Sequence, residues 1–202
     1  MDIHMAAQKL PTAVRQDQIV ETAFQMLSEN ATRPLHIKDI ADRMGLAPSA
    51  LYRHFRNRDA LMSAILELIR TKLYKNVEAV RQASDNVMVR LRELLSRHVS
   101  LIKERHGIPR ILFSDELWGQ NQERRQKMFR ILTGYLAEIE DMVREGQRNG
   151  QISDEISPKA VAKMFFSIVQ PAALLWHMSG GGFDIDDHIT ACWPVFAKTI
   201  GR

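Results

Sequence analysis

The residues best suited to chemistry lie in a short stretch of basic and hydrogen-bonding side chains between positions 33 and 58. Lys and Arg outnumber Asp there by four charges, which equals the net charge of +4 on the whole chain. The charged residues of the stretch are Arg33, Lys38, Asp39, Asp42, Arg43, Arg53, Arg56 and Arg58. A positive patch on an otherwise neutral body favours a polyanion such as nucleic acid. The alternative is a solvated surface that happens to be basic.

Other groups of reactive side chains give only weak evidence of a catalytic or metal site. Asp115 and Glu116 together with His98 or His106 form a set that could converge on a catalytic centre, but no nucleophile or metal-ligand spacing accompanies them. Cys192 is the single cysteine, so neither an intramolecular disulfide nor a cysteine-based zinc site can form. We therefore expect a protein that is not an enzyme and that holds no metal and no cofactor.

The elements that must position the basic stretch are helices. Apolar residues recur with helical spacing through nearly the whole chain of 202 residues, and no convincing strand alternation interrupts them. An all-α fold of about nine helices is predicted. No apolar segment reaches the length of a signal peptide or a membrane span, so we expect a cytoplasmic protein without a membrane partner.

Three helices around the basic stretch fit a helix-turn-helix. The first is predicted over residues 13–29 and the second over residues 37–44, followed by Gly45 where a positive φ is needed to turn the chain. The third begins at Pro48, which suits a first helical position, and Asn57 is a good N-cap for a long fourth helix. This arrangement leaves the outer face of the third helix available to a DNA groove.

The stretch from His36 to Leu61 resembles the DNA-binding signature of TetR-family regulators, most specifically in the Leu-Tyr-x-His-Phe core that ends at Phe55. The resemblance implies a homodimer, a helical C-terminal body that varies between members, and repression relieved by a small ligand. Ala47 stands where the family usually has Ser or Thr, so the third helix should lack its usual side-chain cap. Pro48 should compensate by fixing the first turn.

The resemblance assigns Tyr52, His54 and Arg58 to the DNA backbone, and each of these side chains can donate to a phosphate oxygen. The alternative for Tyr52 is a core aromatic residue whose hydroxyl reaches the surface. Ser49 and Arg53 are candidates for base edges, because a hydroxyl can reach several bases and Arg can pair bidentately with guanine. The predicted DNA-binding residues are His36, Lys38, Pro48, Ser49, Ala50, Tyr52, Arg53, His54 and Arg58.

The chain is expected to divide into a flexible arm over residues 1–12, a helix-turn-helix domain over residues 13–60, and a ligand-sensing and dimerisation domain over residues 61–202. In the last of these, His98 lies on an inward apolar stripe, either as a core residue or as a polar group of a pocket for an apolar or aromatic effector. The predicted pocket residues are His98, Phe113, Trp118, Met128, Tyr135, Phe165 and Gln170.

The last two helices are predicted to form the dimer interface. The helix over residues 161–178 is apolar nearly all round and needs cover on both sides, and the helix over residues 186–200 carries a second apolar stripe. The predicted interface residues, which should together leave an exposed apolar patch on a monomer, are Phe166, Leu174, Ile189, Trp193 and Phe196. The alternative function is a TetR-like DNA-binding protein without a small effector, whose body docks a protein partner.

Overall fold

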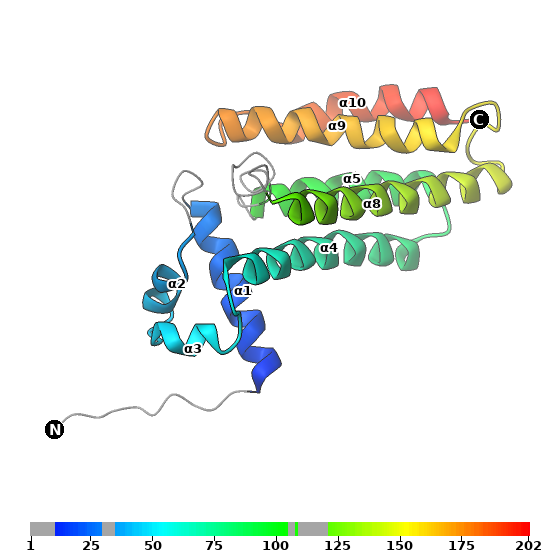
Figure 1. Cartoon of the computed structure of the whole chain (residues 1–202). Coiled ribbons are helices and arrows are strands. Elements are labelled where there is room, and N and C mark those ends of the chain that lie inside the picture. Colours follow the sequence, from blue (N-terminus) through cyan, green and yellow to red (C-terminus); the bar gives the residue numbers. More distant parts are fainter. Residues whose placement is uncertain (1–10, 30–34, 105–107, 109–120) are drawn as a thin grey trace.

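The computed structural model describes residues 11–29, 35–104, 108 and 121–202, and these residues form helices joined by short connections (Figure 1). The predicted all-α fold is confirmed. The helix expected from Pro109, with Phe113 and Trp118, lies outside the described residues, as does most of the arm over residues 1–12. The helices are α1 (Thr12–Glu29), α2 (Ile37–Arg43), α3 (Pro48–Tyr52), α4 (Arg58–Ala83), α5 (Val87–Glu104), α8 (Gln122–Arg148), α9 (Pro158–Met178) and α10 (Ile185–Ile200).

A small head made of α1, α2 and α3 stands at one end of the molecule (Figure 1). The inward face of α1 supplies its core, since Ile19, Ala23 and Phe24 are completely buried and recur at helical spacing. Burying one such large apolar side chain stabilises the fold by about 1.5–3 kcal/mol. The head is therefore held by the same face of α1 that packs against α2 and α4.

The long helix α4 joins the head to the body. It begins as predicted at Asn57, whose side-chain oxygen accepts a hydrogen bond from the Ala60 amide at 2.9 Å. The expected domain boundary between residues 60 and 61 falls within its first turn. At 1.5 Å per residue the helix is about 39 Å long, so it runs from the head across the whole body.

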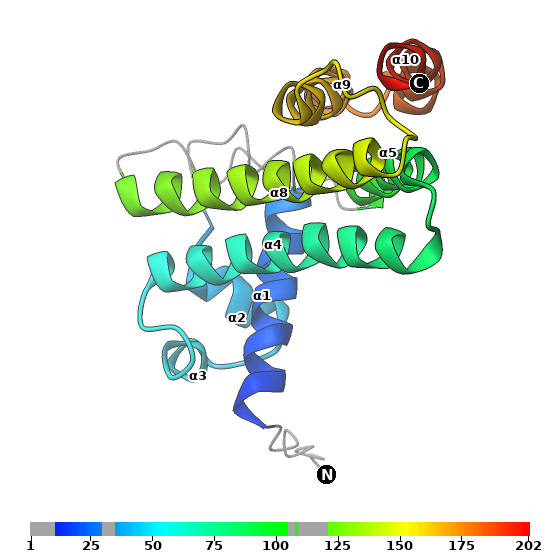
Figure 2. The same cartoon turned by 90° about the vertical axis from the view of Figure 1, so that its right-hand side faces the viewer.

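The body consists of layered helices (Figure 2), with α4 on one side, α5 and α8 in the middle, and α9 and α10 on the other side. Of the described helices, none is both long and apolar enough to span a membrane. Where α4 and α8 cross, the hydroxyl of Tyr74 lies directly against Gly134, and a Cβ at that position would overlap it. Glycine here lets the two helices approach closely.

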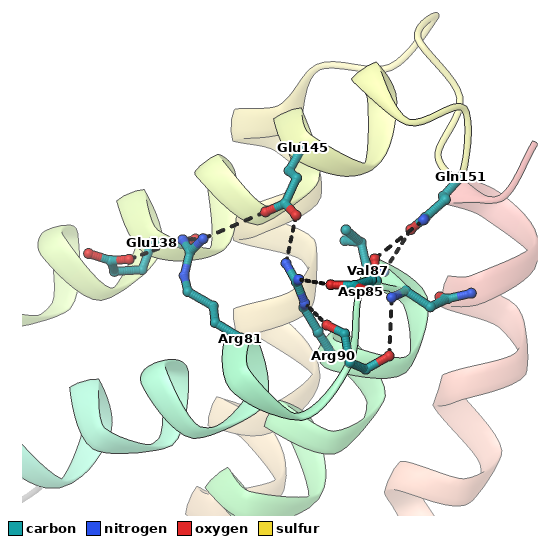
Figure 3. Close-up of polar contacts among 9 residues, drawn as sticks. Arg81, Asp85, Val87, Arg90, Glu138, Glu145 and Gln151 are labelled. Carbon is teal, nitrogen blue, oxygen red and sulfur yellow. Dashed lines mark hydrogen bonds and ion pairs between the residues drawn. The ribbon is translucent and has the colours of Figure 1, made fainter.

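Ion pairs and hydrogen bonds join the ends of α4, α5 and α8 that lie far from the head (Figure 3). Arg81 of α4 donates to Glu138 of α8 at 3.2 Å and lies 3.7 Å from Glu145. Arg90 of α5, with a side chain only 7% exposed, binds Glu145 at 2.8 Å. The Gln151 side chain accepts from the first amide of α5 at 2.7 Å. Because Arg81 lies on α4 and Arg90 also donates to the Ser84 carbonyl at the C-cap of α4, this network restrains the far end of α4.

Candidate DNA-binding surface and effector site

The turn between α2 and α3 has the geometry that the sequence predicts. Gly45 has a φ of +64°, and the Leu46 amide donates to the Ala41 carbonyl at 2.9 Å. Pro48 is the first residue of α3, and Ala47 before it caps the helix with no side-chain hydrogen bond. The proline ring presets φ for the first turn, so the short helix begins without a capping oxygen.

The outer face of α3 presents hydrogen-bonding side chains to solvent. Leu51 points inward and is 1% exposed, whereas Tyr52 is 55% exposed, which excludes Tyr52 as a core aromatic residue. Ser49 and Arg53 are also exposed and stand four residues apart, on one face of the helix. Of the other predicted DNA-binding residues, those exposed are His36, Lys38 and Pro48, and those half-buried are Ala50, His54 and Arg58.

The end of α3 is supported from α1. The Gln16 side-chain amide donates to the His54 carbonyl at 3.3 Å, and Phe55 next to it is buried in the head. These contacts fix the position at which α3 ends, and so the direction in which its exposed side chains point. The sequence pattern did not identify Gln16, because its partner is 38 residues away in the chain.

Arg43 contributes less to the positive patch than its charge suggests. Its guanidinium binds Glu29 of α1 through two hydrogen bonds of 2.5 and 2.6 Å. These hydrogen bonds lower the pKa of Glu29, so the pair stays ionised. Part of the local excess of positive charge is therefore compensated by a carboxylate that lies outside the basic stretch.

Arg58 lies where the head meets the body. Burial lowers the pKa of its guanidinium, the neighbouring Arg124 of α8 lowers it further, and Asp59 raises it. The guanidinium remains protonated at neutral pH, because an arginine side chain loses its proton only in strongly alkaline solution and its pKa stays far above 7. Arg124 donates to Asp59 at 2.9 Å. A residue of the body thus contacts the turn that carries a predicted phosphate contact.

A buried polar pair lies in the body between α5 and α8. The Nδ1 atom of His98 lies 3.2 Å from the Tyr135 hydroxyl, and both side chains are buried. Phe166 of α9 packs beside them, with its ring 6.4 Å from that of His98 and 6.5 Å from that of Tyr135. Burial lowers the pKa of His98 to about 4 and raises that of Tyr135, so both groups are neutral at pH 7.

The structure brings only part of the predicted pocket together. Met128 and Phe165 are buried and Gln170 is half-buried. The ring of Phe165 packs on Phe196 of α10 at 6.0 Å, so it is Phe166, assigned from the sequence to the dimer interface, that completes the aromatic cluster around His98. Phe113 and Trp118 lie outside the described residues.

A hollow that the sequence did not predict lies between α1 and α4. Its volume is about 900 Å³, and its floor includes Val20, Phe55 and Leu68. Lys127 of α8 and Ser63 of α4 stand at its edge. Side-chain packing between the head and the body is therefore incomplete on this side of α4.

The outward faces of α9 and α10 leave apolar side chains exposed. Leu174 is 37% exposed, as predicted for a patch, and the sequence missed Leu175 at 45%, Met178 at 73% and Val195 at 64%. The expectation that Phe196 adds to this patch is wrong, because it is 1% exposed. Phe196 packs on Phe165 of the same chain, whereas the preceding residue, Val195, is exposed to solvent. Ile189 and Trp193 are half-buried.

Two family models match the chain. Residues 19–65 match the model for bacterial regulatory proteins of the tetR family. Residues 67–198, well over half of the chain, match the model for the C-terminal region of YsiA-like proteins, a TetR C-terminal domain. The two matches meet inside α4, close to where the head joins the body.

Known relatives are distant in sequence and close in fold. A fatty acid metabolism regulator protein from Bacillus subtilis (strain 168) is 24% identical over 168 residues, covering 83% of this chain and 86% of the relative. A nucleoid occlusion factor SlmA from Marinomonas sp. (strain MWYL1) is 20% identical over 156 residues, covering 77% and 79%. The crystal structure of FadR from Bacillus subtilis in complex with stearoyl-CoA superposes with a TM-score of 0.75 at 23% identity, covering 90% of this chain and 97% of that one. A TetR transcription regulator from Haloarcula marismortui reaches 0.81 at 16% identity, covering 94% and 100%.

The buried His98 should make the stability of the protein depend on pH. Its pKa is about 4 in the folded chain, against about 6.5 in an unfolded chain. The unfolded state therefore takes up the proton first as the pH falls from 6.5 towards 4, and folding is destabilised by about 2 kcal/mol at pH 5. Urea unfolding at pH 7.5 and pH 5.0 should show this loss in the wild type and in Tyr135→Phe, but a smaller loss in His98→Gln. An equal loss in all three proteins would show that His98 does not titrate in this way.

Proposed function

Because the chain belongs to the TetR family of bacterial regulatory proteins, we propose that it is a ligand-responsive transcriptional repressor which binds operator DNA through α3. The observation that carries the proposal is the exposed face of α3, with Ser49, Tyr52 and Arg53, within the segment that matches the family model. As a DNA-binding regulator it acts in the cytoplasm. Its operator is a palindrome with half-site centres about one helical turn apart, or a multiple of that distance, because two heads related by a twofold axis must bind it.

Two kinds of DNA contact should be separable by mutation. A palindromic duplex selected from a random pool by the wild-type protein, and a scrambled duplex, supply the two targets. Arg53→Ala should cost about 1–3 kcal/mol on the selected duplex and much less on the scrambled one, as expected for a base contact. Tyr52→Phe and Arg58→Ala should weaken both alike, and Arg58→Ala should lower the salt slope by about one unit.

Arg92→Ala, which removes one exposed charge from α5, is the matched control and should leave both affinities unchanged. Equal losses on the two duplexes for Arg53→Ala would assign Arg53 to the phosphates and leave base reading to Ser49, Ala50 or DNA shape. A wild-type protein that selects no duplex would contradict the proposed function as a whole.

The effector is proposed to be an apolar molecule with few polar groups, and long-chain acyl-CoA is the first class to test. The cluster of His98, Tyr135 and Phe166 supports this, because a neutral polar pair among apolar residues suits a carbonyl attached to a hydrocarbon. The FadR structure with stearoyl-CoA supports the acyl-CoA class by similarity. The other proposed pocket residues are Phe113, Trp118, Met128, Phe165 and Gln170.

Stearoyl-CoA should release the protein from the selected duplex, whereas free CoA should not. Tyr135→Phe should require a higher concentration of stearoyl-CoA for the same release, with DNA affinity in its absence unchanged. Fluorescence anisotropy of labelled duplex measures both quantities. Release by CoA alone, or no response to stearoyl-CoA in a protein that binds DNA, would contradict this choice of effector.

A homodimer through α9 and α10 is the proposed assembly, since exposed apolar side chains gather on these two helices. Leu175→Glu should convert the dimer into a monomer in sedimentation velocity and abolish tight binding to the palindrome. Val89→Glu, at a residue of α5 that is 52% exposed, is the matched control. Phe196 is unsuitable for this test, because a charge in its buried site would unfold the protein. A wild-type monomer at micromolar concentration would end the proposal.

The second candidate is a DNA-binding protein of the same family that docks a protein partner and has no small inducer. The similarity to nucleoid occlusion factors SlmA favours it. Native mass spectrometry separates the two candidates, because a protein that co-purifies with a small molecule in stoichiometric amount supports the ligand-responsive function.

A further inference from the structure

Two basic residues of α8 connect the body to the first turns of α4. Lys127 donates through Nζ to the Ser63 carbonyl at 2.8 Å and to the Ser63 hydroxyl at 2.9 Å, and it lies 3.7 Å from Glu67. Arg124, one turn earlier, donates to Asp59 at 2.9 Å. We refer to Arg124 and Lys127, with Asp59 and Ser63, as the strap.

The strap lies beside an open groove. Lys127 and Ser63 both border the hollow of about 900 Å³ between α1 and α4. That space is open to solvent, and the polar contacts of the strap beside it add to the packing of α4 on α8 in setting the orientation of the head. The first turn of α4 also carries Arg58 and begins five residues after the end of α3, so contacts that hold this turn also restrain the DNA-binding face.

The two ends of α4 are held differently. At the far end, the Arg90 side chain of α5 is 7% exposed and donates to the Ser84 carbonyl at the C-cap of α4, whereas Arg81 of α4 itself is 33% exposed. At the head end, Arg124 is 14% exposed but its partner Asp59 is 58% exposed, and Lys127 is 27% exposed. Partners that stand in water can exchange their contacts for water at low cost, which a buried pair cannot do. The ion pairs of the strap therefore exchange for water more readily than the contacts of Arg90 do.

The strap also lies on the helix that carries the candidate effector cluster. Met128, next to Lys127, is buried in the core. Tyr135, which lies beside His98, is eight residues after Lys127, or about 12 Å along the helix. A small shift or rotation of α8 at Tyr135 would thus be transmitted to Lys127 without passing through α4 itself.

We propose that Arg124 and Lys127 are positioning residues for DNA binding: they hold the head at the orientation at which both heads of a dimer meet one palindrome. This inference rests on the proposed function. It differs from a direct role in DNA binding, because Lys127 Nζ and Arg124 Nη2 donate to residues of α4. Loss of the strap should leave each head able to bind a half-site while it disturbs the spacing between the heads.

The test compares Lys127→Met and Arg124→Gln with Arg130→Gln, which removes an exposed charge from the same helix. Three duplexes are used: the selected palindrome, one half-site, and the palindrome with one base pair inserted at its centre. Both strap variants should bind the palindrome about tenfold more weakly, since the second head is less well placed. Half-site affinity should be unchanged, and the penalty for the inserted base pair should shrink. Lys127→Arg should restore wild-type behaviour, and Arg130→Gln should resemble wild type throughout.

Equal weakening on the half-site, with a salt slope lower by about one unit, would instead make these residues phosphate contacts and overturn the proposal. A second measurement requires no DNA. Spin labels at Lys38→Cys in the head and Asp141→Cys in the body, in a Cys192→Ser background diluted with unlabelled chain, report the head-to-body distance. The distribution should broaden in Lys127→Met and not in Arg130→Gln. An unchanged width would overturn the proposal even if the wild type selects no duplex.

Discussion

The head and the body of this protein share one helix, and the way α4 is held determines what each part can do to the other. An α-helix is stiff along its axis, so a restraint at one end acts on side chains tens of ångströms away. At the far end, Arg90 donates to the Ser84 carbonyl at the C-cap of α4 and binds Glu145 of α8, while contacts of α1 restrain the head on the near end. In this chain of 202 residues, the well-buried Arg90 and the more exposed ion pairs of the strap are placed at opposite ends of α4.

Charge in this protein acts through its arrangement more than through its total. The basic stretch looks uniform in the sequence, yet Arg43 is paired with Glu29 on α1, Arg58 is half-buried beside Arg124, and Arg53 stands in solvent. Of these three side chains, Arg53 is the one that we propose to read a base edge in the groove. By contrast, the body keeps its polar pair of His98 and Tyr135 neutral, since burial favours the uncharged form of both groups.

Features set by neighbouring residues could be predicted from the sequence. The turn at Gly45, the helix start at Pro48 and the cap at Asn57 depend on local backbone geometry, and all three are present. Features set by partners far along the chain could not be predicted in this way. Adjacent residues of a helix point about 100° apart, so a small error in the assigned helix face gives two neighbouring residues each other's environment. Phe165 is assigned from the sequence to the pocket and Phe166 to the dimer interface, but Phe166 lies beside His98 and Phe165 packs on Phe196. The pairing of Arg124 with Asp59 gives no signal in either segment alone.

The contact between Tyr74 and Gly134 has a consequence for how relatives of this chain can diverge. A methyl group at position 134 would displace the phenol, and phenylalanine at position 74 would remove the atom that is displaced. Alanine at 134 is therefore compatible with phenylalanine at 74 and strained with tyrosine, although alanine favours a helix over glycine by about 1 kcal/mol. In an alignment of chains that keep this crossing, the two positions should covary: a residue larger than glycine at 134 should accompany the loss of the hydroxyl at 74.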